Sequence, residues 1–238
     1  METKQLYLYD SYQREFEAKI QNVTGNQVIL DQTAFHPLTG GVANDTGYIA
    51  KDHIKHKVLR VEINRETKEI IHVLDDATGL SQGDTVKGVL DWERRYRLMR
   101  LHTAAHLIAA IMYRDYNALI TGGQVDYEQA KLDFNLLKTE REIFEDAVAK
   151  SNNEVNKGTA LKIYFLERTE ALKVPGIVKL AERMPPQVRE LRIVEIPGID
   201  VQADGGPHVN NTREIGEICL VKIENKGKTQ RRVYFTVK

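Results

Sequence analysis

Residues 91–113 read DWERRYRLMRLHTAAHLIAAIMY, and the pattern of the chain changes at this stretch. It contains no glycine or proline, and apolar residues recur at helical spacing, which predicts a long helix. These residues are Leu98, Leu101, Ala105, Ile108 and Met112. Asp91 is suited to cap the first turn. We therefore place a domain boundary at the start of this helix, between residues 1–91 and 92–238.

The residues before this helix are rich in predicted strands. Alternating or apolar segments lie at 16–23, 27–31, 58–64, 69–74 and 86–91. The turn signal Thr24-Gly25-Asn26 between the first two indicates a hairpin. Several short strands at this spacing are typical of a small barrel or sandwich. We predict a small N-terminal β-barrel.

The residues after the helix mix helices and strands. A second helix is predicted from Thr139, with Glu142 completing a capping box, to a point before Gly158. A shorter helical stretch, 167–183, is interrupted by Pro175 and stopped by Pro185-Pro186. Strands are predicted at 161–166, 188–196, 217–224 and 231–237. The fold class is therefore α+β, a small barrel followed by a two-layer α+β domain.

Composition limits the classes of partner and compartment. The 34 basic and 34 acidic residues cancel, so contact with nucleic acid has to come from local patches. Cys219 is the single cysteine, which excludes an internal disulfide and favours a reducing compartment. The N-terminus lacks a signal-peptide pattern, and no segment approaches the ~18 apolar residues of a membrane span. We predict a cytoplasmic protein with no membrane partner.

Two histidine-bearing segments, about a hundred residues apart, point to a metal site. His102 and His106 share one face of the predicted helix. Asp204 and His208 have the same spacing on a glycine-rich turn and could complete a four-ligand zinc site. Histidines so spaced are more often exposed or core residues, but this helix face is otherwise apolar, where bare imidazoles need partners. The zinc-protease pattern is excluded, because Thr103 stands where it needs a glutamate.

Six segments along the chain resemble one family. His102-x-x-x-His106 with Asp204-Gly-Gly-Pro-His208 and the following Thr212-x-Glu214-Ile215-Gly216 resembles the editing domain of alanyl-tRNA synthetase, and still more the freestanding alanyl-tRNA editing proteins of the AlaX type. The other matching segments are Phe35–Gly47, similar to the glycine-rich motif of the N-terminal barrel, Gly122–Val125, Lys131–Phe134, and Lys226–Lys228 before Arg231-Arg232. The resemblance spans nearly the whole chain.

The resemblance implies a zinc-dependent hydrolase that removes a wrong amino acid from tRNA(Ala), with serine as the expected target. Its metal ligands would be His102, His106, Asp204 and His208, holding one Zn²⁺ per chain. Thr103 and Gln124 are the candidate catalytic residues. Substrate contacts are expected from Thr39, Gly40 and Gly41, and from Lys226, Lys228 and Arg231 at the phosphates of the tRNA acceptor end.

The sequence departs from the family pattern at the metal loop. The family usually has Cys-Gly-Gly-Thr-His, whereas Asp204 and Pro207 stand at the cysteine and threonine positions here. A carboxylate oxygen is an acceptable zinc ligand, but it is harder than a thiolate, so another divalent ion could also be accepted. Alternatively, Asp204 misses the metal and leaves three histidines and an open position. Val42 likewise replaces the usual glutamine of the glycine-rich motif.

Two other functions remain as alternatives. A chain with the Cys-to-Asp change could be a catalytically inactive tRNA-binding or structural metal module of the same fold. Threonyl-tRNA synthetases share a similar His-x-x-x-His domain, which would imply a different tRNA. The glycine-rich barrel motif with Asn44-Asp45-Thr46-Gly47 favours the alanine system.

Overall fold

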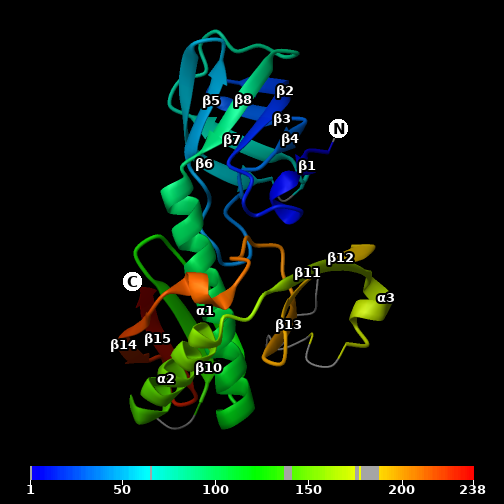
Figure 1. Cartoon of the computed structure of the whole chain (residues 1–238). Coiled ribbons are helices and arrows are strands. Elements are labelled where there is room, and N and C mark those ends of the chain that lie inside the picture. Colours follow the sequence, from blue (N-terminus) through cyan, green and yellow to red (C-terminus); the bar gives the residue numbers. More distant parts are fainter. Residues whose placement is uncertain (1, 65, 137–140, 175–176, 178–187) are drawn as a thin grey trace. The chain divides into compact units, whose positions relative to one another are not determined.

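The computed structural model describes residues 2–64, 66–136, 141–174, 177 and 188–238 (Figure 1). The chain divides into two compact units, Met1–Leu98 and Met99–Lys238. The sequence places the boundary at the start of the long helix, after residue 91. The division in the structure lies within that helix, seven residues further on. Each unit has its own core and is described by itself.

The first unit is the predicted barrel. Six strands close it in the order β2-β3-β7-β6-β5-β8. The strands are β2 (Glu15–Thr24), β3 (Gln27–Leu30), β5 (Gly47–Lys51), β6 (Ile54–Ile63), β7 (Ile70–Leu74) and β8 (Thr85–Leu90). Alternate residues of β2 point inward, so Phe16, Ala18 and Ile20 are buried while their neighbours are exposed. Side chains fill the interior, as they do in other barrels of this size.

Three small elements complete this unit. A 3-10 turn, η1 (Leu6–Leu8), follows β1 (Lys4–Gln5), which pairs in parallel with β4 (Gln32–Thr33).

The strand β5 is not among the predicted strands. It begins with a glycine and only Ile49 of its five residues is fully buried, so its alternation is too weak to read from the sequence.

A buried ion pair explains why the first turns of the long helix, α1 (Trp92–Tyr116), belong to the barrel unit. The Arg95 side chain is fully buried and its Nε lies 3.0 and 3.1 Å from the two carboxylate oxygens of Asp45. Its two terminal nitrogens also donate to the carbonyl oxygens of Ser11 and Ala34. Asp45 in turn accepts the backbone N–H of His36 at 2.6 Å. Arg95 therefore joins four segments of the barrel unit.

The second unit contains an antiparallel sheet in the order β14-β15-β10-β9. Its strands are β9 (Ile120–Val125), β10 (Ala130–Asn135), β14 (Ile218–Asn225) and β15 (Gln230–Val237). The helix α2 (Arg141–Lys157) packs on this sheet, with the rings of Phe134 and Phe144 6.3 Å apart. The Asn152 side chain also bonds the backbone N–H and C=O of Ile218. These layers agree with the predicted α+β class.

A smaller antiparallel sheet carries part of the site. It has the order β11-β12-β13, with β11 (Lys162–Glu167), β12 (Glu190–Ile196) and β13 (Asp200–Ala203). The short helix α3 (Arg168–Ala171) lies in the predicted helical stretch 167–183. Residues 175–176 and 178–183 of that stretch fall outside the described residues, as does the predicted helix start at Thr139. A 3-10 turn, η2 (Thr212–Ile215), follows the metal loop and is closed by a capping box between Asn211 and Glu214. No helix among the described residues is long and apolar enough to cross a membrane.

Candidate metal centre

The helix α1 brings two imidazoles to one buried face. His102 and His106 are 5% and 6% exposed, and their ring centroids are 5.0 Å apart. From Leu98 to Met112 almost every residue of this helix is buried. The surrounding side chains are mostly alanine, leucine and isoleucine, which offer the two imidazoles no polar partner. The partners come from β13 and from the loop after it.

The loop after β13 is shaped by a buried cation. Arg192 of β12 donates to the carbonyl oxygens of Asp204 and Gly206, each at 2.9 Å. The carboxylate of Asp204 accepts the backbone N–H of Gly206 at 2.6 Å. A Cβ at Gly206 would lie 2.5 Å from Cε1 of His102. The loop backbone lies so close to the imidazole that a residue with a side chain does not fit at this position without a shift.

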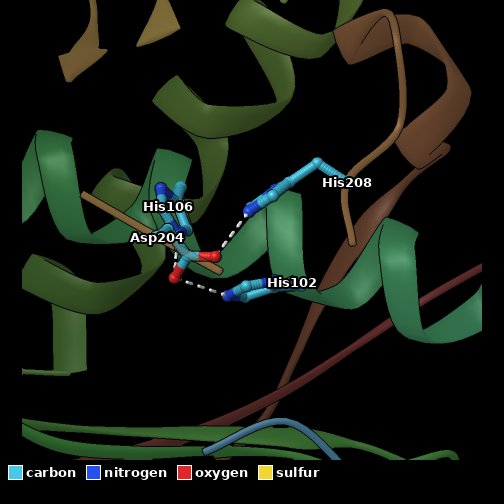
Figure 2. Close-up of side chains that lie close together, drawn as sticks. All are labelled: His102, His106, Asp204 and His208. Carbon is cyan, nitrogen blue, oxygen red and sulfur yellow. Dashed lines mark hydrogen bonds and ion pairs between the residues drawn. The ribbon is translucent and has the colours of Figure 1, made fainter. Parts of the chain in front are cut away.

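Three histidines converge on the Asp204 carboxylate (Figure 2). Its Oδ2 lies 3.5 Å from Nε2 of His102 and 3.8 Å from Nε2 of His106, and its Oδ1 lies 3.3 Å from Nε2 of His208. The four ligand atoms all lie within 4.8 Å of one another. Zinc bonds of about 2.0–2.2 Å place tetrahedral ligand atoms roughly 3.3–3.5 Å apart. The donor set and its spacing therefore fit a tetrahedral zinc site.

The outer nitrogens of two of these rings are already bonded. Nδ1 of His102 lies 3.3 Å from the carbonyl oxygen of Pro207, which can only accept. Nδ1 of His208 lies 3.0 Å from Oγ1 of Thr103, whose hydroxyl donates to the carbonyl of Met99 at 2.9 Å and so accepts from the imidazole. Both rings therefore carry hydrogen on Nδ1, which leaves Nε2, the nitrogen that faces Asp204, as the one able to bind a metal.

The electrostatics of the cluster suit a cation. Burial opposes ionisation of Asp204, but the charge and hydrogen bonds of His102 hold the pKa of the carboxyl well below its usual range. Burial and repulsion from His102 hold the pKa of His208 well below its ordinary value. Burial also lowers the pKa of His106, but hydrogen bonds to Asp200 and Asp204 outweigh it and raise the pKa to about 9. A metal ion would thus displace a proton from His106.

Comparison with known proteins covers both units. Residues 2–94 match the family model described as tRNA synthetases class II (A), and residues 191–234 match the second additional domain of threonyl and alanyl tRNA synthetases. The alanyl-tRNA editing protein AlaX-M of Saccharolobus solfataricus is 53% identical over 237 residues, which are 99% of each chain. The chain belongs to the AlaX-M family.

Other relatives fit this assignment. The AlaX-M protein of Methanosarcina barkeri is 38% identical over 240 residues, again 99% of each chain. The alanine–tRNA ligase of Sulfurisphaera tokodaii is 36% identical over 229 residues, which are 93% of this chain but 25% of the ligase. The AlaX-M chain thus matches one quarter of a synthetase over nearly its whole length.

The remaining predicted site residues of this AlaX-M chain lie in three places. Thr103 is fully buried and, besides its bond to His208, accepts the N–H of Val209 at 3.3 Å. Gln124 is exposed on β9 and lines a hollow with Lys131 and Tyr234. In the barrel unit the exposed residues Thr39, Gly40 and Gly41 line a second hollow.

The predicted phosphate-binding cluster is divided by burial. Lys226 and Lys228 are exposed at the hairpin between β14 and β15. Arg231 is 5% exposed, and its guanidinium donates to the carbonyl oxygens of Gly227 and Gln230. The structure thus gives Arg231 a place inside the turn, where it closes the hairpin that carries the two lysines.

Two residues at the centre are not among the predicted ones, Arg192 and Asp200. Both are charged and both are buried, at 6% and 2% exposure. Burial of a charge is costly unless it is paired. In the sequence, the signal is a charged residue in an inward position of an apolar strand. Arg192 stands between Leu191 and Ile193, both buried, but the sequence of the strand does not indicate which groups Arg192 contacts.

Proposed function

We propose that this chain is a trans-editing hydrolase that deacylates mischarged tRNA(Ala), most effectively Ser-tRNA(Ala), in the cytoplasm. The observation that carries the proposal is the convergence of His102, His106, Asp204 and His208 in a chain related over 99% of its length to proteins named for alanyl-tRNA editing. The ester between an amino acid and the terminal ribose is already reactive. The protein mainly has to position it and stabilise the charge that develops on its carbonyl oxygen.

We further propose that the four residues hold one Zn²⁺ per chain. Support comes from the donor set, three imidazoles and a carboxylate, and from ligand-atom separations close to those of a tetrahedron. When bound, the ion would polarise the ester carbonyl or lower the pKa of a water. An oxygen ligand at Asp204 also suits other divalent ions, so cobalt or manganese should be accepted more readily than by a thiolate site.

Within this proposal Thr103 acts by orienting His208. Its hydroxyl bonds Met99, His208 and Val209, so it holds the ring rather than facing a substrate. Gln124 is exposed and keeps the role of a candidate substrate contact. Lys226 and Lys228 are exposed cations suited to phosphates of the acceptor end, and Arg231 supports their turn.

Serine preference needs a hydrogen-bonding partner for the side-chain hydroxyl. A size difference of one small group gives only about 1–3 kcal/mol, whereas a polar group left unpaired by alanine adds to the discrimination. Thr39 has an exposed hydroxyl beside Gly40 and Gly41, where the backbone is accessible. We propose that this segment contacts the aminoacylated end. Thr39→Val should reduce the preference for serine over alanine while leaving zinc binding unchanged.

The experiment compares deacylation of Ser-tRNA(Ala), Gly-tRNA(Ala) and Ala-tRNA(Ala), with metal content determined on the same protein. We expect rapid loss of serine, sparing of alanine and about one zinc per chain. His102→Ala and His208→Ala should abolish deacylation and lose the metal, while His53→Ala, an exposed histidine of the barrel, should behave as wild type.

Three results would change the proposal. Stable zinc and tRNA binding without cleavage of any of the three esters would indicate the catalytically inactive module. Full turnover in His208→Ala would show that the cluster is not the reaction centre. Cleavage of mischarged tRNA(Thr) in place of tRNA(Ala) would assign the chain to a different tRNA.

A further inference from the structure

The Asp200 carboxylate lies directly behind the metal centre. It is the first residue of β13, and its side chain is fully buried. Its Oδ2 lies 2.9 Å from Nδ1 of His106, the nitrogen on the far side of the ring from Asp204. The amide of Gln202 donates to both oxygens, at 3.1 and 3.4 Å. Asp200 is therefore held in place from β13 while it holds His106.

The Nδ1 contacts of the three site histidines differ in charge. His102 meets the carbonyl of Pro207 and His208 meets the hydroxyl of Thr103, both neutral acceptors. His106 meets a carboxylate. A hydrogen bond to an ionised acceptor is stronger than one to a neutral group, and a carboxylate behind a ligating imidazole makes that imidazole a better electron donor. His106 is thus the ring whose donor strength the protein adjusts most.

The charges at the centre also favour tight binding of a divalent cation. Asp204 supplies one negative charge within the ligand set and Asp200 a second one directly outside it. Together they balance a divalent cation buried among otherwise neutral ligands, which lowers the cost of removing the ion from water. Asp204 is a harder ligand than a thiolate and binds zinc less tightly. A more basic His106 would offset part of that difference.

We propose that Asp200 is a positioning residue that fixes His106 with Nε2 directed at the metal and tightens metal binding, with Gln202 holding the Asp200 carboxylate in register. This inference rests on the proposed zinc site, but it concerns metal affinity and ring orientation, which are measured without tRNA. Loss of such a carboxylate typically costs about 10–100-fold in metal affinity.

The test is competition between the protein and a chromogenic chelator for zinc. In Asp200→Asn, which keeps the side-chain shape and removes its charge, we expect the zinc Kd to rise about 10–100-fold. Asp146→Asn makes the same chemical change at a half-exposed carboxylate of α2 and should leave Kd unchanged. Gln202→Leu keeps the charge but removes the amide donor, and should raise Kd by a smaller factor. An unchanged Kd in a folded Asp200→Asn protein would overturn the proposal.

A measurement on the unaltered protein keeps the proposal testable if Asp200→Asn does not fold. Long-range proton–nitrogen NMR of the zinc-loaded chain reports which nitrogen of each histidine carries hydrogen. We expect His106 as the Nδ1–H form, with the most deshielded Nδ1 proton of the three site rings. A His106 that binds zinc through Nδ1 would contradict the inference. Failure of the wild type to deacylate any tRNA would contradict the proposed function but not this result.

Discussion

Gly206 shows how little freedom single residues have at the centre. The loop backbone passes so close to the imidazole of His102 that a Cβ at this position would lie 2.5 Å from Cε1 and 2.8 Å from Nδ1 of the ring. The same glycine donates its N–H to Asp204, and its carbonyl oxygen accepts a hydrogen bond from Arg192. One small residue therefore sets the placement of His102 and Asp204, two of the four clustered side chains.

Gly206→Ala should displace the His102 ring by part of an ångström or more. Because small misplacements at a reacting centre cost up to about 100-fold in rate, we expect kcat/KM for Ser-tRNA(Ala) to fall by at least 10-fold and the zinc Kd to rise. Gly123→Ala is the matched control, since its Cβ would meet the flexible end of Leu132 at 3.1 Å. Wild-type zinc affinity in Gly206→Ala would show that the loop adjusts.

The clustering of His102, His106, Asp204 and His208 could be predicted from spacing because a helix and a tight loop each present residues four apart together. Asp200 and Arg192 could not be assigned in the same way. Their roles depend on pairing between β12 and β13 and on the loop folding back over α1, and neither is visible in local sequence. The burial of Arg231 inside its turn could not be predicted either, because one buried arginine among several exposed cations leaves no pattern in the sequence.

At the scale of elements, periodicity decided which segments could be predicted. The helix α1 and the strands β2, β3, β6, β7 and β8 were predicted within a few residues because their alternation or helical repeat is strong. The strands β5, β9 and β13 are short and carry glycine or polar residues, so tertiary pairing rather than pattern fixes them. β10 is not among the predicted strands, although burial of Ala130, Leu132 and Phe134 follows a clear alternation.

The start of α1 depends on the buried Arg95–Asp45 pair. Asp45→Ala would leave the guanidinium buried and unpaired, so we expect the barrel unit to lose about 3–5 kcal/mol of stability in urea unfolding. Glu15→Ala removes one partner of an exposed pair with Lys87, where water screens the attraction, and should change stability far less. Equal effects of the two substitutions would contradict this interpretation.

The buried His72 of β7 should make the stability of the barrel decrease in acid. Burial lowers the pKa of His72 to about 4, against a raising contribution from its bond to Val28. Below pH 6.5 the unfolded chain takes up a proton that the folded chain refuses until about pH 4, so stability falls as pH falls through this window. We expect a loss of about 2 kcal/mol between pH 7 and 5 from this group. If His72→Gln loses the same stability between pH 7 and 5, the loss comes from another group.

At the scale of the whole molecule, all four residues of the candidate metal centre and Asp200 belong to the second compact unit. An ion that binds the folded state stabilises it by mass action, by about 2.7 kcal/mol at a hundred times Kd. Removal of zinc with a chelator should therefore speed amide exchange in α1 beyond Met99, β12 and β13. Exchange in β2, β3 and β7 of the barrel should stay the same. Equal acceleration in both units would show that the metal stabilises the chain as a whole.

The carboxylate at position 204 has a consequence for oxidative chemistry. A thiolate ligand is converted by peroxide to sulfenic acid or a disulfide, and it then releases its metal. The cluster of three imidazoles and one carboxylate contains no sulfur, and the single cysteine, Cys219, lies on β14. Peroxide should therefore leave zinc bound at a concentration that strips it from Asp204→Cys, as measured by release to a chromogenic chelator. The exchange of sulfur for oxygen would let this centre keep its metal under oxidising conditions.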